Sequence, residues 1–243
     1  MADPTDPTDP TTEPHPAEAT APSLRDWTGV RPPRRETIRG TWVDLEPLDP
    51  ARHGDDLFVA STAEGAEERF AYLPEVPPTD RGEFTEWLST AASSPDPLFF
   101  AVIDRVTGRA VGRQALMRVD PANGVIEIGN ILWGPALART RGATEAFFLF
   151  ADMVFTAGYR RFEWKCNDAN LPSKRAAVRF GFTAEGVFRQ HMVVKGRNRD
   201  TAWFSILDSE WPQLREAFAA WLDPSNFDET GKQRRSLREL RGR

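Results

Sequence analysis

Apolar and polar residues follow two different periods along this chain, and the periods alternate in a regular order from residue 41 onward. Segments with period two predict β-strands, and segments with apolar residues three or four positions apart predict helices. The expected strands cover residues 41–48, 98–104, 109–119, 125–133, 161–167, 187–195 and 201–207, and the expected helices cover residues 50–61, 80–91, 143–157, 173–180 and 212–222. This order indicates an α/β domain with a mixed sheet and helices on both faces.

Local signals agree with several of the expected helix ends. Asp49 before Pro50 predicts a helix start, because a capping carboxylate is followed by proline at the first helical position. Asp80 predicts a second cap of the same kind, and Gly158 predicts a helix end. The helix at residues 143–157 carries aromatic side chains around most of its circumference, so we expect it to be buried against the sheet.

The two ends of the chain differ in composition from the region between them. Residues 3–11 repeat Asp-Pro-Thr three times, and polar, proline-rich sequence does not bury enough apolar surface to become ordered. We therefore expect a disordered acidic tail at residues 1–23, a single domain at residues 24–226 and a basic tail at residues 227–243.

The net charge of −5 comes from the N-terminal segment. Residues 1–30 hold six acidic residues and one basic residue, whereas the rest of the chain holds 30 of each. A neutral domain lacks the basic stripe that binders of DNA or RNA present. No apolar run approaches the roughly 20 residues that span a bilayer. We therefore expect neither nucleic acid nor membrane as a partner.

Cysteine and histidine usage narrows the chemistry further. The single cysteine, Cys166, excludes an intrachain disulfide and is expected as a small core residue. The N-terminus does not show the basic and then apolar order of a secretory signal, so we expect a cytoplasmic protein. His15, His53 and His191 are dispersed, and the sequence therefore gives no reason to expect a metal site.

The most informative segment lies between residues 125 and 170. An apolar strand at residues 125–133 leads through an Arg/Gly/Thr turn into the aromatic helix, and a second apolar strand follows at residues 161–167. Backbone N–H groups at a helix N-terminus, with two guanidinium groups beside them, suit a phosphorylated ligand. In such a unit the ligand lies at the carboxyl end of the first strand. A nucleotide-bearing cofactor is therefore the favoured ligand class.

Three stretches resemble the GNAT superfamily of acetyl-CoA-dependent N-acetyltransferases, and its RimJ/RimL branch most of all. They are Glu127–Trp133 leading to Arg139–Thr144, Asn170–Ser173 followed by Gly181-Phe182, and Glu185-Gly186 before Arg189–His191. The resemblance covers roughly residues 40–210. It implies a mostly antiparallel, twisted sheet in which two neighbouring parallel strands splay apart. It also implies acetyl-CoA as the co-substrate, with no metal.

The resemblance further implies which residues bind CoA. The turn offers N–H groups to the pyrophosphate through Arg139, Thr140, Arg141, Gly142, Ala143 and Thr144. The backbone of Leu132 and Trp133 pairs with the pantetheine amides, and Asn170 and Ser173 contact the cofactor. Each of these roles has an alternative. Arg139 and Arg141 could be a solvated surface pair, and Gly142 could belong to an ordinary helix-entry turn. Asn170 could be a loop residue that closes a turn.

Acetyl transfer needs a neutral amine, so a base must remove a proton from the acceptor. Glu127 is the best-placed carboxylate, and an outward-facing strand residue is its equal alternative. His191 is the second candidate, with a structural histidine as its alternative, because Met192 replaces the glutamate of RimL-like enzymes. Ser173 is the candidate acid that reprotonates the CoA thiolate, since Ala177 replaces the tyrosine of many GNAT enzymes. Simple helix capping is the alternative role for Ser173.

The expected activity is transfer of the acetyl group of acetyl-CoA to a primary amine by direct attack in a ternary complex. The amine belongs to a small molecule or to a protein N-terminus, and polar loops at residues 64–79 and 195–200 are expected to face it. A catalytically weak acyl-CoA sensor or scaffold with the same fold is the alternative. Apolar edge strands near the C-terminus would allow a homodimer.

Overall fold

The computed structural model describes residues 23–242, so the acidic tail expected at residues 1–23 lies outside the described residues except for Ser23. The strands are β1 Ile38–Arg39, β2 Val43–Pro47, β3 Leu98–Asp104, β4 Ala110–Asp120, β5 Val125–Trp133, β6 Arg161–Asn167, β7 Thr183–Val194 and β8 Arg197–Leu207. The helices are α1 Pro50–Thr62, α2 Ala66–Phe70, α3 Arg81–Ser93, α4 Arg141–Thr156, α5 Leu171–Phe180, α6 Trp211–Leu222 and α7 Leu237–Leu240, with a 3₁₀ turn at Pro224–Asn226. No helix within residues 23–242 combines the length and the apolar content that a membrane span needs.

All eight strands belong to one sheet, in the order β1-β2-β3-β4-β5-β6-β8-β7. Neighbouring strands are antiparallel, with the exception of the parallel pair β5 and β6. Parallel neighbours need a crossover connection, and α4 supplies it between these two strands. The expected mixed, mostly antiparallel sheet is therefore confirmed.

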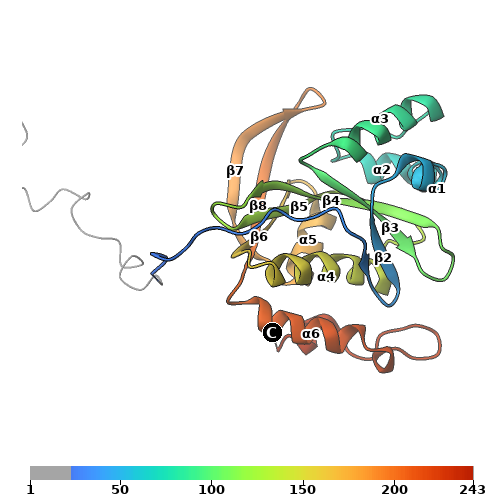
Figure 1. The fold of residues 1–243 in the computed structure, drawn as a ribbon. Helices are drawn as coiled ribbons and strands as arrows, with labels where there is room; N and C mark the ends of the chain where they lie inside the picture. The colour runs from blue at the N-terminus through green and yellow to red at the C-terminus, as the bar shows by residue number, and fades with distance from the viewer. Residues whose placement is uncertain (1–22, 243) are drawn as a thin grey trace, which may run out of the picture.

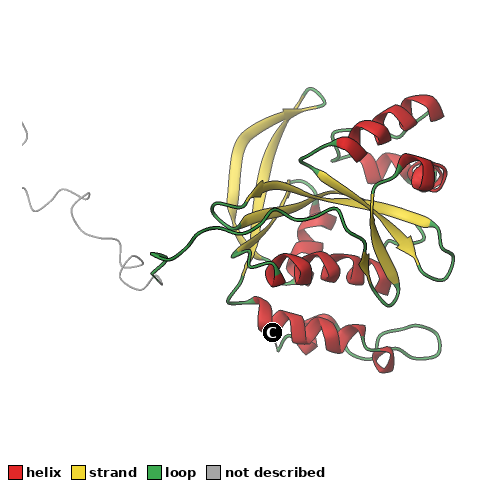
Figure 2. Cartoon of the chain, in the orientation of Figure 1, coloured by secondary structure: helices red, strands yellow, loops and turns green. Residues whose placement is uncertain are grey.

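Helices cover both faces of the sheet, as Figures 1 and 2 show. On one face α1 and α3 enclose a smaller core, in which Leu57 and Leu88 are packed with Phe99 of β3. On the other face α4 and α6 enclose the larger core, which includes Phe147 and Phe150. The aromatic helix is thus buried against the sheet, as its sequence predicts, because apolar side chains around its circumference meet the sheet on one side and α6 on the other.

Several helix boundaries differ from the sequence expectation. Helix α4 begins at Arg141 rather than Ala143, because Thr140 acts as its N-cap and accepts a hydrogen bond from the Ala143 N–H. Helix α5 begins at Leu171, because Asn170 rather than Ser173 supplies its capping side chain. The short helix α2 and the two-residue strand β1 were not expected, since neither is long enough to show a period.

The turn of the β7–β8 hairpin lies at Lys195-Gly196 instead of residues 196–200. Both residues have positive φ, 50° and 71°, which matches the twist of a two-residue hairpin turn. The strands therefore extend almost to the tip, and the hairpin projects from the sheet as a long arm (Figure 1).

The segment expected as a basic C-terminal tail contains helix α7. Its Leu237 is 1% exposed and belongs to the larger core. The Arg241 guanidinium donates hydrogen bonds to the carbonyl oxygens of Val178 and Arg179 at the end of α5. Leu237 and Arg241 therefore hold this segment on the domain. Its basic composition gave no sign of this, because a solvated tail would have the same composition.

Candidate active site

The parallel strands β5 and β6 separate at their carboxyl ends. They are paired only from Val125–Arg161 to Ile128–Trp164, although β5 continues to Trp133 and β6 to Asn167. A β-bulge bends β5 just beyond the last pair, and its Asn130 has a φ of 49°. The expected splay is therefore confirmed, and one backbone edge of β5 is left without a neighbouring strand beyond Ile128.

A cavity of about 220 Å³ lies at this opening. Its wall includes Trp164 and Cys166, which belong to the core beneath α4, and also Arg69 and Tyr72 from the opposite side of the sheet. The other lining residues are Leu73, Pro74, Met117, Arg118, Glu127, Ile128, Gly129, Asn130, Ile131, Lys165, Asn167, Asn170, Ser173, Met192 and Arg199. The cavity thus passes between the separated strands and connects the two faces of the sheet.

The segment at residues 69–74 closes one side of the cavity. Lys195 at the hairpin tip donates a hydrogen bond of 2.9 Å to the carbonyl oxygen of Phe70. The Tyr72 hydroxyl donates one of 3.2 Å to the carbonyl oxygen of Ala169. Both loops expected to face the acceptor, residues 64–79 and 195–200, therefore meet beside this cavity.

The N-terminus of α4 follows the splayed end of β5. The first N–H groups of a helix have no partner within the helix, and of these the Ala143 N–H is bound by Thr140 Oγ1 at 3.3 Å. The N–H groups of Arg141 and Gly142 have no hydrogen-bond partner within residues 23–242. A Cβ at Gly142 would come within 3.0 Å of Val43 Cγ1, so this glycine also permits close packing of α4 on β2.

The side chains of this turn have separate roles. The Arg141 guanidinium stacks 3.5 Å from the ring centroid of Trp42, so it is fixed rather than freely solvated. Arg139 is exposed and has a φ of 66°. Thr144 is buried, and its hydroxyl accepts a hydrogen bond from Arg179 of α5. In the free protein the helix N-terminus therefore presents backbone amides, with Arg139 as the solvated cation beside them.

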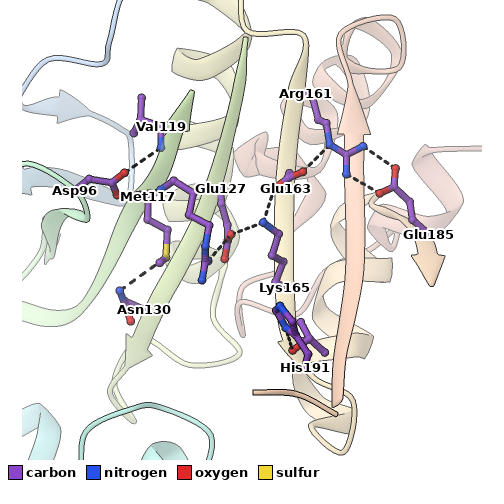
Figure 3. A network of polar contacts seen from close by, with 12 residues as sticks. Asp96, Met117, Val119, Glu127, Asn130, Arg161, Glu163, Lys165, Glu185 and His191 are labelled. Carbon is purple, nitrogen blue, oxygen red and sulfur yellow. Dashed lines mark hydrogen bonds and ion pairs between the residues drawn. The ribbon is translucent and has the colours of Figure 1, made fainter. Parts of the chain in front are cut away.

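Glu127 is buried, at 3% exposure of its side chain, and lines the cavity. Its Oε2 forms ion pairs with the Arg118 guanidinium at 2.7 Å and with Lys165 Nζ at 3.0 Å, and Figure 3 shows the second of these. Its Oε1 accepts no hydrogen bond within residues 23–242. The outward-facing alternative is therefore wrong, and the surroundings of the carboxylate are ionic rather than apolar.

Ser173 and Asn170 lie at the start of α5, on the cavity wall. The Ser173 hydroxyl accepts a hydrogen bond of 2.9 Å from Trp164 Nε1, and it also forms a side-chain hydrogen bond with Cys166. Asn170 Oδ1 caps the helix by accepting from the Ser173 N–H at 3.1 Å, so its Nδ2 remains available to a ligand. Burial raises the pKa of the neighbouring Cys166 thiol, in keeping with a core residue rather than a nucleophile.

His191 lies on β7 and is not among the residues that line the cavity. Its Nδ1 is 2.9 Å from Thr201 Oγ1, and its ring packs edge-on against Phe188. The next residue, Met192, does line the cavity. The structure thus brings Glu127, Asn170 and Ser173 together and leaves His191 outside.

This geometry accords with a known family of enzymes. The Acetyltransferase (GNAT) domain matches residues 43–183, which include the splayed strands, the α4 N-terminus and Ser173. The chain belongs to this family. It is accordingly an acyltransferase.

Several GNAT relatives are similar over much of the chain. A GCN5-related N-acetyltransferase from Brucella melitensis is 60% identical, with a TM-score of 0.89 over 90% of this chain and 100% of that chain. A GNAT-family protein from Chromobacterium violaceum ATCC 12472 is 41% identical, with a TM-score of 0.74 over 79% of this chain and 96% of that chain. An uncharacterised N-acetyltransferase, p20 of Bacillus licheniformis, is 32% identical over 117 residues, or 46% of this chain and 63% of the relative. That last match therefore spans less than two thirds of the relative's length.

Sequence reasoning missed three cations of this GNAT site: Arg118, Lys165 and Arg199. One signal was available, because Glu163 and Lys165 are two positions apart in an apolar strand and must share a face. The other two carry no local signal. Arg118 reaches Glu127 from a bulge with a φ of 48°, and Arg199 comes from β8.

Proposed function

We propose that this GNAT enzyme transfers the acetyl group of acetyl-CoA to a primary amine by direct attack in a ternary complex. The observation that carries the proposal is the separation of β5 and β6 beyond Ile128, with a cavity lined by Glu127 and Ser173 at the opening and the N-terminus of α4 following the end of β5. A ligand with an anionic diphosphate, an amide-bearing arm and a thioester matches these features.

The residues available for acetyl-CoA fit its chemical groups. The N–H groups of Arg141 and Gly142 suit the diphosphate, with Arg139, Thr140, Ala143 and Thr144 completing the turn. Leu132 and Trp133 pair with β4 on one side, and their other edge, which has no neighbouring strand, suits the amides of the arm. The Nδ2 of Asn170 suits a carbonyl oxygen. Acetyl-CoA supplies the activated acetyl group, and the chain orients it and manages the protons.

Glu127 is the group that we propose as the base. An alkyl amine is mostly protonated at neutral pH, and the carboxylate Oε1, which accepts no hydrogen bond from the described residues, is the atom that removes the proton. The amine nitrogen then bonds to the carbonyl carbon and loses its second proton to water, and the carbon–sulfur bond breaks. Ser173 donates its hydroxyl proton to the departing thiolate. Glu127 and Ser173 return to their starting states by proton exchange with water.

The proposal is tested by thiol release from acetyl-CoA with a panel of primary amines. We expect amine-dependent release of one thiol per acetylated amine, with a KM for acetyl-CoA of roughly 1 µM to 1 mM, and heat on titration with CoA. CoA binding without amine-dependent release would identify the sensor or scaffold alternative instead. Neither binding nor release would overturn the proposal.

Replacing Ser173 by alanine is expected to lower kcat by about 100-fold, the lower end of what a general acid contributes. Ser173→Thr keeps the hydroxyl and is the matched control, with most of the activity retained. Because Asn170 supplies the helix cap, folding is not expected to fail. Steady-state kinetics measure this change in kcat. Equal kcat values for Ser173→Ala and wild type would show that Ser173 is not the general acid and only has a structural role.

We also propose the RimJ/RimL-like branch and a cytoplasmic location for this enzyme. The branch is supported by Asn170–Ser173 with Gly181-Phe182, which lie at the α5 start and end as that pattern requires. A homodimer is proposed through β7, the edge strand of the sheet, on which Phe188 and Val193 are exposed.

A further inference from the structure

Charged side chains cross the face of the sheet that carries Glu127, and most of them balance one another. Three carboxylates alternate with three cations across β4, β5, β6 and β7, as Figure 3 shows in part. The members, in spatial order, are Arg118, Glu127, Lys165, Glu163, Arg161 and Glu185, with ion-pair distances of 2.6 to 3.0 Å. This charge ladder has no net charge, so it leaves no carboxylate over for a further cation.

Arg199 is a further cation at the same place. It lines the cavity from β8, and its side chain makes no hydrogen bond or ion pair within residues 23–242. Its Nε is buried without a partner. Burial lowers the pKa of Arg199, and the pull of Cys166 and Glu127 opposes this while Arg118 adds to it. Arg199 is half-buried, and a guanidinium that is partly removed from water is stabilised when an anion binds to it.

No other charged side chain of the cavity wall forms an ion pair with Arg199 within residues 23–242. Arg69 is occupied at the end of α1, where it donates to the carbonyl oxygens of Ala60, Ala63 and Glu64. The thioester end of acetyl-CoA is neutral, and the diphosphate belongs to the α4 N-terminus. The unmatched positive charge therefore faces the space left for the acceptor, where it repels polyamines and other multiply charged cations.

We propose that the acceptor is a small amino-carboxylate, whose carboxylate binds Arg199 while its amine faces Glu127. This inference rests on the proposed acetyl transfer to an amine. A planar guanidinium presents paired N–H donors that match the two oxygens of a carboxylate.

The segment that borders the cavity limits the size of the acceptor. Its volume is about 220 Å³, and the segment at residues 69–74 is tied across it to the hairpin tip and to the loop after β6. A small acceptor suits a site that is bridged in this way, whereas a peptide needs an open groove for the residues that follow its first.

The test compares amines that differ only by a carboxylate. The matched pairs are L-alanine with ethylamine, L-methionine with 3-(methylthio)propylamine and L-phenylalanine with 2-phenylethylamine, together with spermidine and a peptide with N-terminal serine. We expect kcat/KM for at least one amino acid to exceed that of its decarboxylated partner by roughly 10- to 100-fold, as one charged hydrogen-bonded contact provides.

Arg199→Gln should remove this preference, so that the ratio of kcat/KM for the amino acid to kcat/KM for its decarboxylated partner falls to about one. A misfolded variant would lose both rates, so the ratio of the two is its own control. Arg197→Gln is the matched substitution: Arg197 is an exposed arginine on the same strand, does not line the cavity, and its loss should leave the preference unchanged.

Calorimetry with the CoA-saturated enzyme separates the two proposals. Binding of an amino acid that Arg199→Gln abolishes would support the carboxylate site even if no amine were acetylated, in which case only the proposed function fails. Acetylation of ethylamine, spermidine or the peptide at rates equal to or above those of the amino acids would overturn the amino-carboxylate proposal and leave acetyl transfer standing. No turnover and no binding would overturn both.

Discussion

A Glu127→Gln enzyme is expected to show a kcat roughly 100- to 10,000-fold below that of wild type, the range that a general base contributes. Glutamine keeps the shape of the side chain but does not accept a proton at neutral pH. The effect should fall on kcat rather than on CoA binding, since the α4 amides are unchanged. Thiol release at saturating acetyl-CoA and amine measures it.

Glu163→Gln is the matched control for this prediction. Glu163 is also a buried carboxylate held between two cations, at 2.7 Å from both Arg161 and Lys165, but it does not line the cavity. Both variants should lose about 1–3 kcal/mol of unfolding free energy, because each leaves charged donors less well paired. Activity lost equally in both variants would show that Glu127 only maintains the charge ladder.

Phe147→Ala is expected to lower the free energy of unfolding by about 3–5 kcal/mol. Phe147 is fully buried in α4, and its ring stacks on that of Phe180 at a centroid distance of 4.3 Å. It also lies within 6.1 Å of Phe162, Phe182 and Phe218. Removal of the ring leaves a cavity at the junction of α4, α5, α6 and the sheet.

Urea denaturation followed by circular dichroism measures this loss. Phe188→Ala on the exposed face of β7 removes the same ring where it is 54% exposed, and it should cost less than about 1 kcal/mol. A Phe147→Ala protein as stable as the Phe188→Ala protein would show that the aromatic cluster can collapse around the missing ring.

The sequence predicted most of the fold because its elements are long enough to show their period. Helix α4 and strands β3 to β6 lie within one or two residues of their expected bounds. The elements that were missed are short or depend on distant contacts: α2 has five residues, and α7 is held by burial of Leu237. The hairpin turn was misplaced because two positive φ angles decided it, and only Gly196 of the two residues signals such a conformation.

The candidate site divides in the same way between local and distant information. The order of elements placed the α4 turn after the first of two parallel strands, and the resemblance to the GNAT superfamily added Glu127, Asn170 and Ser173 as candidate site residues. The alternation of side chains along a strand predicts that Glu127 and Ile128 face opposite sides of the sheet. It does not predict which of these two sides carries charged side chains. The tertiary structure decided this, because Arg118, Lys165 and Arg199 reach the cavity from three other strands. Pairing between strands far apart in sequence sets the surroundings of a carboxylate, and no period along the chain records it.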